Sequence, residues 1–171
     1  FTGLIPMACA NLPYNITTPV LTALIEAERF ACIAVMIQRE VALRICAAPG
    51  TADYGAFSVY CQYHTQPELL FDVGPECFVP APKVTSSVIR MVPRPTPPEG
   101  VTDEKRFFRV VKAAFGQRRK TLLNALSAGL GGVDKETIRT AMETAGLPEN
   151  IRGERLGIPE FAALTRALGE F

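Results

Sequence analysis

The sequence predicts an α/β fold followed by a small domain made only of helices. Over residues 1–92, short apolar runs alternate with stretches of helical spacing, which is typical of strands joined by crossover helices. Four prolines then fall within residues 93–100, and such a run favours an extended spacer. The segments beyond it have helical periodicity. We therefore expect domains at 1–92 and 103–171, joined by a linker at 93–102.

The first domain begins with an apolar run at residues 7–10, which we expect to form a strand. A helix should follow at about 18–28, because Thr18 can cap its free amides and Pro19 suits the first helical position. Residues 30–37 are almost continuously apolar, which favours a parallel strand shielded on both faces.

A second helix is expected at 38–48, ended by a Pro-Gly pair. Two further strands are expected at 68–73 and 87–92, as an antiparallel pair around the proline-rich turn at 75–82. The residues at 56–63 suit either a helix or a strand. The single histidine, His64, has the character of a surface or helix-end residue.

The second domain should contain four helices, at about 103–115, 118–130, 135–145 and 159–168, with Asp134 capping the third. Seven basic residues and no acidic residue occur from Lys105 to Lys120. Because a solvated helix face usually mixes both charges, this run predicts contact with nucleic acid. Basic residues at the start of the second helix would oppose its dipole, a cost that bound phosphates would offset. The candidate contacts are Lys105, Arg109, Lys112, Arg118, Arg119 and Lys120.

The tetrapeptide from Asn11 to Tyr14 is the strongest candidate for a reactive site. It follows the first strand and precedes a helix, and ligands bind at this edge of open α/β sheets. The Asn11 side chain can accept a hydrogen bond from an amine, as can the carbonyl of Leu12 or Pro13. Tyr14 adds a flat face for stacking on a planar ring. Together these groups suit an exocyclic amine such as adenine N6, whose reaction would depend on positioning and local electrostatics.

Three motifs carry a resemblance to a known family. Asn-Leu-Pro-Tyr at 11–14 resembles the catalytic motif of adenine-N6 methyltransferases. The stretches at 78–88 and 114–122 are similar to the F-x-P-x-P-K-V-x-S motif and to the basic helix pair of the same enzymes. In this order and spacing, they resemble the KsgA/RsmA-type small-subunit rRNA adenine dimethyltransferases across nearly the whole chain.

The resemblance implies a Rossmann-like sheet and a reaction. The first domain would be the C-terminal half of an S-adenosylmethionine-dependent methyltransferase sheet, in which 56–63 is a crossover helix. Methyl groups would pass to N6 of two adjacent adenines in the 3′-terminal hairpin of small-subunit (16S) rRNA, during ribosome biogenesis. Asn11 would hold the amine and line the cofactor side, and Phe78 would stack on the adenine opposite Tyr14.

The family's glycine-rich cofactor motif does not occur in these 171 residues. We therefore expect the C-terminal part of a longer protein, inactive alone. Two other functions stay open: an Erm-type 23S rRNA methyltransferase, which shares the first two motifs, and a non-catalytic RNA-binding factor in ribosome assembly.

Composition narrows the class of protein. The sequence is 48% hydrophobic and 20% charged, and its net charge of +1 combines an acidic 1–92 with a basic 93–171. Its five cysteines form no C-x-x-C pair, so we expect reduced, mostly buried thiols, no metal site and a cytoplasmic location. The predicted partner is small-subunit rRNA within its pre-ribosomal particle. We expect no membrane contact and a monomeric protein. Gln38, Arg39 and Glu40 have no predicted role beyond helix initiation.

Overall fold

The computed structural model describes residues 3–171 and divides the chain into two compact units. The first runs up to Ala47 and resumes over Cys61–Thr96, and the second comprises Ala48–Tyr60 and Pro97–Phe171. The later boundary falls inside the predicted linker. Residues 1 and 2, at the start of the predicted first domain, lie outside the described residues.

Residues 48–60 differ from the predicted division, because they belong to the helical unit. The buried hydroxyl of Tyr54 donates to the carbonyl of Leu156 at 2.9 Å, and the amide of Gly50 donates to the carbonyl of Glu154 at 2.7 Å. Such contacts join segments about a hundred residues apart in sequence, which local patterns do not encode.

The first unit contains a four-stranded sheet in the order β1-β2-β4-β3. β1 pairs in parallel with β2, whereas β4 pairs antiparallel with both β2 and β3. The predicted parallel strand and the predicted antiparallel pair are therefore confirmed. The strands are β1 (Met7–Asn11), β2 (Cys32–Gln38), β3 (Thr65–Val73) and β4 (Ser86–Pro93).

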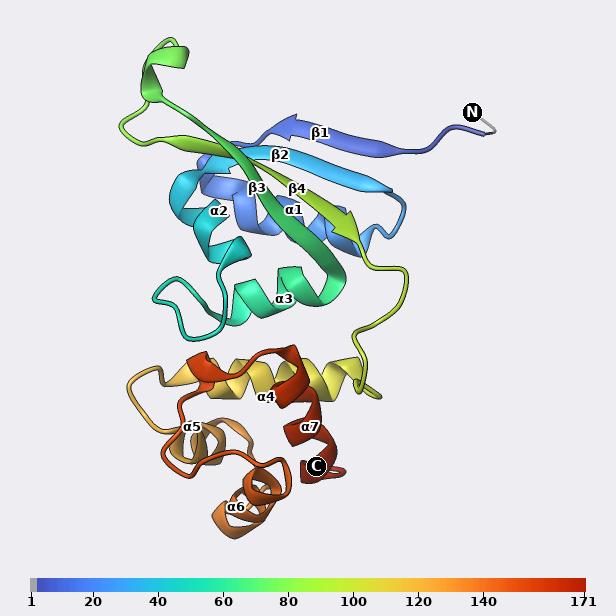
Figure 1. Ribbon diagram of the computed structural model, residues 1–171, viewed down its shortest axis with the longest axis vertical. Coiled ribbons are helices and arrows are strands. Elements are labelled where there is room, and N and C mark those ends of the chain that lie inside the picture. The colour runs from blue at the N-terminus through green and yellow to red at the C-terminus, as the bar shows by residue number, and fades with distance from the viewer. Residues whose placement is uncertain (1–2) are drawn as a thin grey trace. The chain divides into compact units, whose positions relative to one another are not determined.

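The core of the first unit lies on one face of this sheet. Ile33, Val35 and Ile37 alternate along β2 and are at most 1% exposed, and Ile89 and Met91 of β4 are fully buried. In Figure 1, α1 (Thr17–Glu26) and α2 (Arg39–Cys46) lie along one side of the sheet. The intervening β2 side chains are only half-buried, so the prediction of a strand shielded on both faces is wrong for the described chain.

The entry into α1 also differs from prediction. A short 3₁₀ turn, Tyr14–Ile16, precedes the helix, which begins at Thr17 after an N-cap at Ile16 that makes no side-chain cap. The Thr17 hydroxyl donates instead to the carbonyl of Pro13 at 3.2 Å. The predicted cap by Thr18 is therefore wrong, because the helix begins before Thr18 and no side chain caps its first amides.

The segment with two possible structures is a helix, α3 (Ala56–His64). His64 is its last residue, and the ring packs edge-on against Tyr63 with centroids 4.8 Å apart, in agreement with a helix-end role.

The second unit contains four further helices, and Asp103 and Asp134 cap two of them with their side chains. Phe107, Leu126 and Phe161 are fully buried and come from three of the helices. The helices are α4 (Glu104–Gly116), α5 (Leu122–Gly129), α6 (Lys135–Thr144) and α7 (Ile158–Leu168).

The basic triplet 118–120 does not begin a helix. Residues 117–120 form a turn in which the Lys120 amide donates to the Gln117 carbonyl at 2.9 Å, and α5 begins at Leu122 after an extended Thr121. The prediction that these charges oppose a helix dipole is therefore wrong, because residues 118–120 lie in the turn before α5 and not in the helix.

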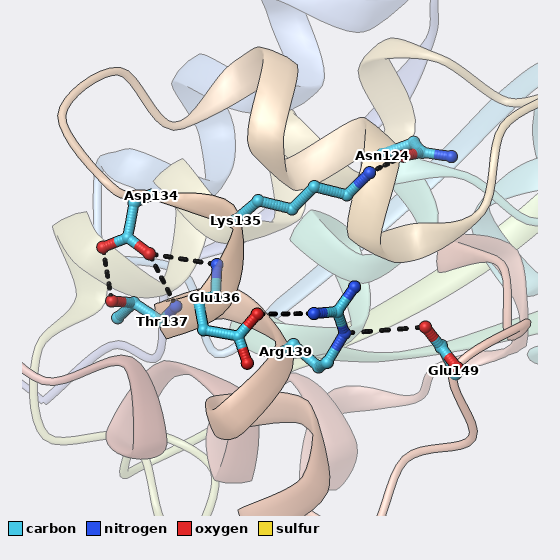
Figure 2. Close-up of polar contacts among 7 residues, drawn as sticks. All are labelled: Asn124, Asp134, Lys135, Glu136, Thr137, Arg139 and Glu149. Atoms are coloured by element: carbon cyan, nitrogen blue, oxygen red, sulfur yellow. Dashed lines mark hydrogen bonds and ion pairs between the residues drawn. The ribbon is translucent and has the colours of Figure 1, made fainter.

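Figure 2 shows how polar side chains hold the start of α6. Asp134 accepts from the amides of Glu136 and Thr137 and from the Thr137 hydroxyl. These bonds lower the pKa of the Asp134 carboxyl. Lys135 reaches across to Asn124 of α5, with 3.0 Å between Nζ and Oδ1. The predicted Asp134 cap is confirmed.

All five thiols are free, but they are not mostly buried as predicted. Cys61 is buried, Cys32 and Cys46 are half-buried, and Cys9 and Cys77 are exposed. Burial raises the pKa of the Cys61 thiol to about 12. Over residues 3–171, no helix combines the length and the apolar character needed to cross a bilayer.

Candidate functional site

The Asn11–Tyr14 segment leaves the sheet at the carboxyl end of β1. Backbone pairing continues one residue beyond the strand, because the Leu12 amide donates to the Met36 carbonyl at 3.0 Å. The Leu12 side chain is only 6% exposed, whereas Asn11 is exposed. A buried anchor thus holds the turn while the carboxamide stays accessible.

The Pro13 carbonyl is already occupied. It accepts from the Ile16 amide and from the Thr17 hydroxyl, both at 3.2 Å. A carbonyl oxygen has two lone pairs, so these two bonds use its accepting capacity. The sequence offered the carbonyl of Leu12 or that of Pro13 as the second acceptor. The Leu12 carbonyl is therefore the better acceptor for a ligand amine.

Tyr14 is half-buried and is fixed at its hydroxyl. Its oxygen lies 2.7 Å from Oγ of Ser86, the first residue of β4, which is 1% exposed. The bond joins residues 72 positions apart and links the first two sequence motifs.

Asn11, Tyr14 and Phe78 line one pocket. Its volume is about 270 Å³, and its other walls come from Leu12, Pro13, Pro80 and Pro82. Phe78 is half-buried and lies in the loop between β3 and β4. Figure 1 shows this loop and the carboxyl end of β1 at the same edge of the sheet. The structure thus brings together all five residues predicted for the chemistry.

A larger apolar groove, of about 530 Å³, follows α1 and is lined by residues such as Val20, Leu24 and Phe30. Its only charged lining residue is Arg29. The smaller pocket is the better candidate, because specificity requires a few convergent polar groups as well as apolar walls.

The loop that carries Phe78 is closed at its base by a polar network. Arg39 Nε donates to Asp72 Oδ2 at 2.9 Å, and the Ser87 hydroxyl donates to Asp72 Oδ1 at 2.6 Å. The bonds from Ser87 and Arg39 lower the pKa of the Asp72 carboxyl. The Arg39 amide also donates to the Thr85 carbonyl at 3.0 Å. Arg39 thus receives a role that the sequence did not reveal.

The pocket does not by itself fit S-adenosylmethionine. Its lining offers one carboxamide, from Asn11, but no carboxylate to receive an ammonium group or ribose hydroxyls. Among residues 3–171, no three His, Cys, Asp or Glu side chains gather as metal ligands do. The pocket therefore suits a flat, mostly apolar group that carries an amine.

The predicted RNA-binding side chains are all exposed in the second unit, but two of the six make contacts within it. Arg109 donates to the carbonyls of Gly131 and Phe171, and its guanidinium lies 4.9 Å from the centre of the Phe171 ring. Arg118 donates to the carbonyls of Ala52 and Tyr54 at 3.1 and 3.3 Å. The other four have no hydrogen-bond or ion-pair partner in the described part of the chain: Lys105, Lys112, Arg119 and Lys120.

Sequence reasoning missed Ser86. The residue lies inside the quoted 78–88 motif, but a serine at a strand start suggests only turn chemistry. No sequence signal marks it, because its burial, which makes the hydroxyl need a partner, follows from the strand pairing.

Comparison with known proteins gives a consistent result. A family model described as ribosomal RNA adenine dimethylase matches residues 6–153. Ribosomal RNA small subunit methyltransferase A of Alkaliphilus metalliredigens is 49% identical over 158 residues, covering 92% of this chain and 55% of that protein. The protein of the same name from Bacillus mycoides is 48% identical, covering 95% of this chain and 56% of its own length. The chain thus spans about half the length of these curated relatives.

Solved structures agree on the fold. A dimethyladenosine transferase from Plasmodium falciparum superposes with a TM-score of 0.78 at 21% identity, covering 95% of this chain and 67% of that one. The 23S rRNA methyltransferase ErmE gives a TM-score of 0.70 at 20% identity, covering 98% and 69%. These likenesses confirm the predicted fold class, and the matches in sequence confirm the resemblance drawn from the motifs. The chain belongs to the ribosomal RNA adenine dimethylase family.

Proposed function

We propose that this chain supplies the adenine-binding pocket and the RNA-binding helical domain of an rRNA adenine-N6,N6-dimethyltransferase. The observation that carries the proposal is the pocket of about 270 Å³, into which two distant segments bring a carboxamide and two aromatic rings. Such a set can recognise an aminopurine by its amine and by its flat faces at once.

The amine is held by two acceptors. The Asn11 side-chain oxygen and the Leu12 carbonyl accept the two N6 hydrogens, since the Pro13 carbonyl is occupied. The amine lone pair is delocalised into the ring, so orienting it towards an electrophile accelerates transfer without a strong base. The methyl group is supplied by S-adenosylmethionine, for which this pocket provides only the Asn11 side.

Tyr14 and Phe78 hold the base between them. Stacking on an aromatic side chain contributes about 1–3 kcal/mol per base. Two such contacts offset the few kcal/mol that removal of a base from its stack requires. The selectivity for an extruded adenine would therefore reside in this pocket.

The substrate we propose is a pair of adjacent adenines in the 3′-terminal hairpin of 16S rRNA, methylated during ribosome assembly in the cytoplasm by a monomeric enzyme. The names of the relatives at 46–49% identity support the small subunit. An Erm-type 23S activity is supported only by a likeness of fold at 20% identity.

The second unit would bind the rRNA backbone. Lys105, Lys112, Arg119 and Lys120 are the principal candidates. Arg109 and Arg118 hold the unit together as well, and each guanidinium still has N–H groups for phosphate after its internal bonds. Backbone contacts would position the RNA while the pocket selects the reacting base.

Asn11→Ala tests the pocket in the full-length protein encoded by the gene. Loss of one oriented acceptor is expected to lower kcat for methyl transfer to 16S rRNA by about 10²–10³-fold. Asn15→Ala is the matched control, because Asn15 is exposed and does not line the pocket. Near-normal turnover of Asn11→Ala would contradict the role assigned to it.

The isolated 171-residue chain provides a second test. We expect no methyl transfer and no measurable binding of S-adenosylmethionine in calorimetric titration, because the pocket lacks a carboxylate for the cofactor. Micromolar binding would contradict this expectation.

A further inference from the structure

We infer that Ser86 is a positioning residue, which sets the plane of the Tyr14 ring through the hydrogen bond between their hydroxyls. The inference rests on the proposed function and extends it to a residue that does not line the pocket. The two oxygens lie 2.7 Å apart, a typical distance for a strong hydroxyl pair.

Such a restraint suits the position of Tyr14 in the chain. It is the first residue of a three-residue 3₁₀ turn, and its side chain is only half-buried. Packing alone does not fix a ring that one side of a pocket leaves open. A bond at the far end of the ring restricts both its side-chain torsions.

Ser86 is itself rigidly placed. It is 1% exposed and begins β4, where it is paired with Gln38 of β2 on one side and Val73 of β3 on the other. A hydroxyl held by two neighbouring strands is a fixed reference point, whereas a hydroxyl on a loop would move with its loop.

The same residue ends the loop that carries Phe78. The loop leaves β3 after Val73 and returns at Ser86, and these two residues face each other in the sheet. Ser87, the next residue, donates to Asp72, which also binds Arg39. The Tyr14–Ser86 bond therefore connects one aromatic wall of the pocket to the base of the loop that bears the other wall. It fixes the relation between the rings, on which stacking depends.

Ser86→Ala and Tyr14→Phe each remove this bond, and Tyr14→Phe retains the stacking face. In the full-length protein, each is expected to lower kcat for 16S rRNA methylation by about tenfold, because small misplacements of a substrate are costly. KM for rRNA should change little, since phosphate contacts dominate RNA affinity.

The double variant gives the decisive measurement. If Ser86 acts through the Tyr14 hydroxyl, the Tyr14→Phe/Ser86→Ala protein should lose no more activity than either single variant. Ser86→Thr, which keeps the hydroxyl, should recover activity relative to Ser86→Ala. Losses that multiply in the double variant, or normal kcat in Ser86→Ala, would overturn the inference.

Thr65→Ala is the control for a merely structural effect. Thr65 is a fully buried hydroxyl in the same sheet, 2.7 Å from the Cys61 carbonyl and outside the pocket. It should lower the melting temperature without changing kcat. A wild-type protein that fails to methylate 16S rRNA would refute the proposed function, whereas an active wild type with normal Ser86 variants would refute only the role of Ser86.

Discussion

Single side chains determine how the pocket edge is held, and Asp72 is an example. One oxygen of its carboxylate accepts a hydrogen bond from the Ser87 hydroxyl, and the other accepts one from the Arg39 guanidinium. Both Asp72 and Arg39 are nearly half-exposed, and exposed ion pairs contribute little on average. Ser87, however, is fully buried, so its hydroxyl depends on Asp72 as an acceptor.

The lowered pKa of Asp72 predicts a pH-dependent stability. A carboxyl whose pKa is lower in the folded state stabilises the fold above its unfolded pKa, of about 3.9. That contribution is lost as the pH falls through the folded pKa. Asp72→Asn should therefore reduce the free energy of unfolding at pH 7, and the difference from wild type should shrink below about pH 4.

Urea unfolding at pH 7 and at pH 3 measures this effect. Asp53→Asn is the matched control, since Asp53 is an exposed carboxylate with no ion-pair partner within residues 3–171. An equal deficit of Asp72→Asn at both pH values would contradict the assignment.

Helices of the second unit pack closely where small residues meet. A Cβ atom added to Gly129, at the end of α5, would lie 2.6 Å from Cβ and 2.9 Å from Cα of Ala113 in α4. Real side chains do not approach so closely, so the two helices would have to separate. The close contact with Ala113 explains why a glycine, which has no Cβ atom, stands at this end of α5.

Gly129→Ala is expected to destabilise the protein by about 1–3 kcal/mol, the usual cost of overpacking a core. Gly131→Ala is the control, because nothing lies within 4 Å of its added Cβ and its φ is not positive. Denaturant titration of both variants measures the difference. Equal stability of the two would show that α4 and α5 separate without cost.

At the level of elements, sequence patterns identified what local chemistry controls. The apolar run at β2 and the Asp134 cap depend on neighbours within a few residues. The errors arose at helix starts that also make distant contacts, from Tyr14 to Ser86 and from Arg118 to the 48–60 segment. The prediction of a Thr18 cap was wrong because a 3₁₀ turn precedes the helix. The prediction of a helix from residue 118 was wrong because residues 117–120 form a turn closed by a hydrogen bond to Gln117.

In the pocket too, local motifs were predictable and contacts between distant residues were not. Its aromatic and amide residues were recognisable from their motifs, but Ser86 and the Arg39–Asp72 pair were not. Their bonds join residues 72 and 33 positions apart, and only the strand register brings them together. Sequence spacing carries no information on that register.

For the whole molecule, RNA affinity should depend on charges in the second unit. The exposed side chains of Lys112 and Arg119 have no partner among the described residues, so each is available to displace a counterion from the RNA. Lys112→Ala and Arg119→Ala should each weaken rRNA binding and reduce the slope of log K against log salt by about 0.7–0.9.

Filter binding of the full-length protein to a 16S rRNA fragment, over a range of salt concentrations, measures these slopes. Lys135→Ala is the control, because Lys135, on α6, binds Asn124 of α5 and lies outside the basic run. Arg118→Ala should lower the melting temperature as well, since its guanidinium holds two carbonyls of the 48–60 segment. Unchanged slopes in the Lys112 and Arg119 variants would show that the RNA does not contact these two side chains.

The exposed thiol of Cys77 has a practical consequence. It is adjacent to Phe78, on the loop that borders the pocket. A fluorophore could be attached there through maleimide chemistry, after replacement of the other exposed thiol, Cys9, by serine. It would sit beside Phe78, the ring that we propose to stack on the base. Its emission would report the arrival of a nucleotide in real time, so stopped-flow traces could follow base capture separately from methyl transfer.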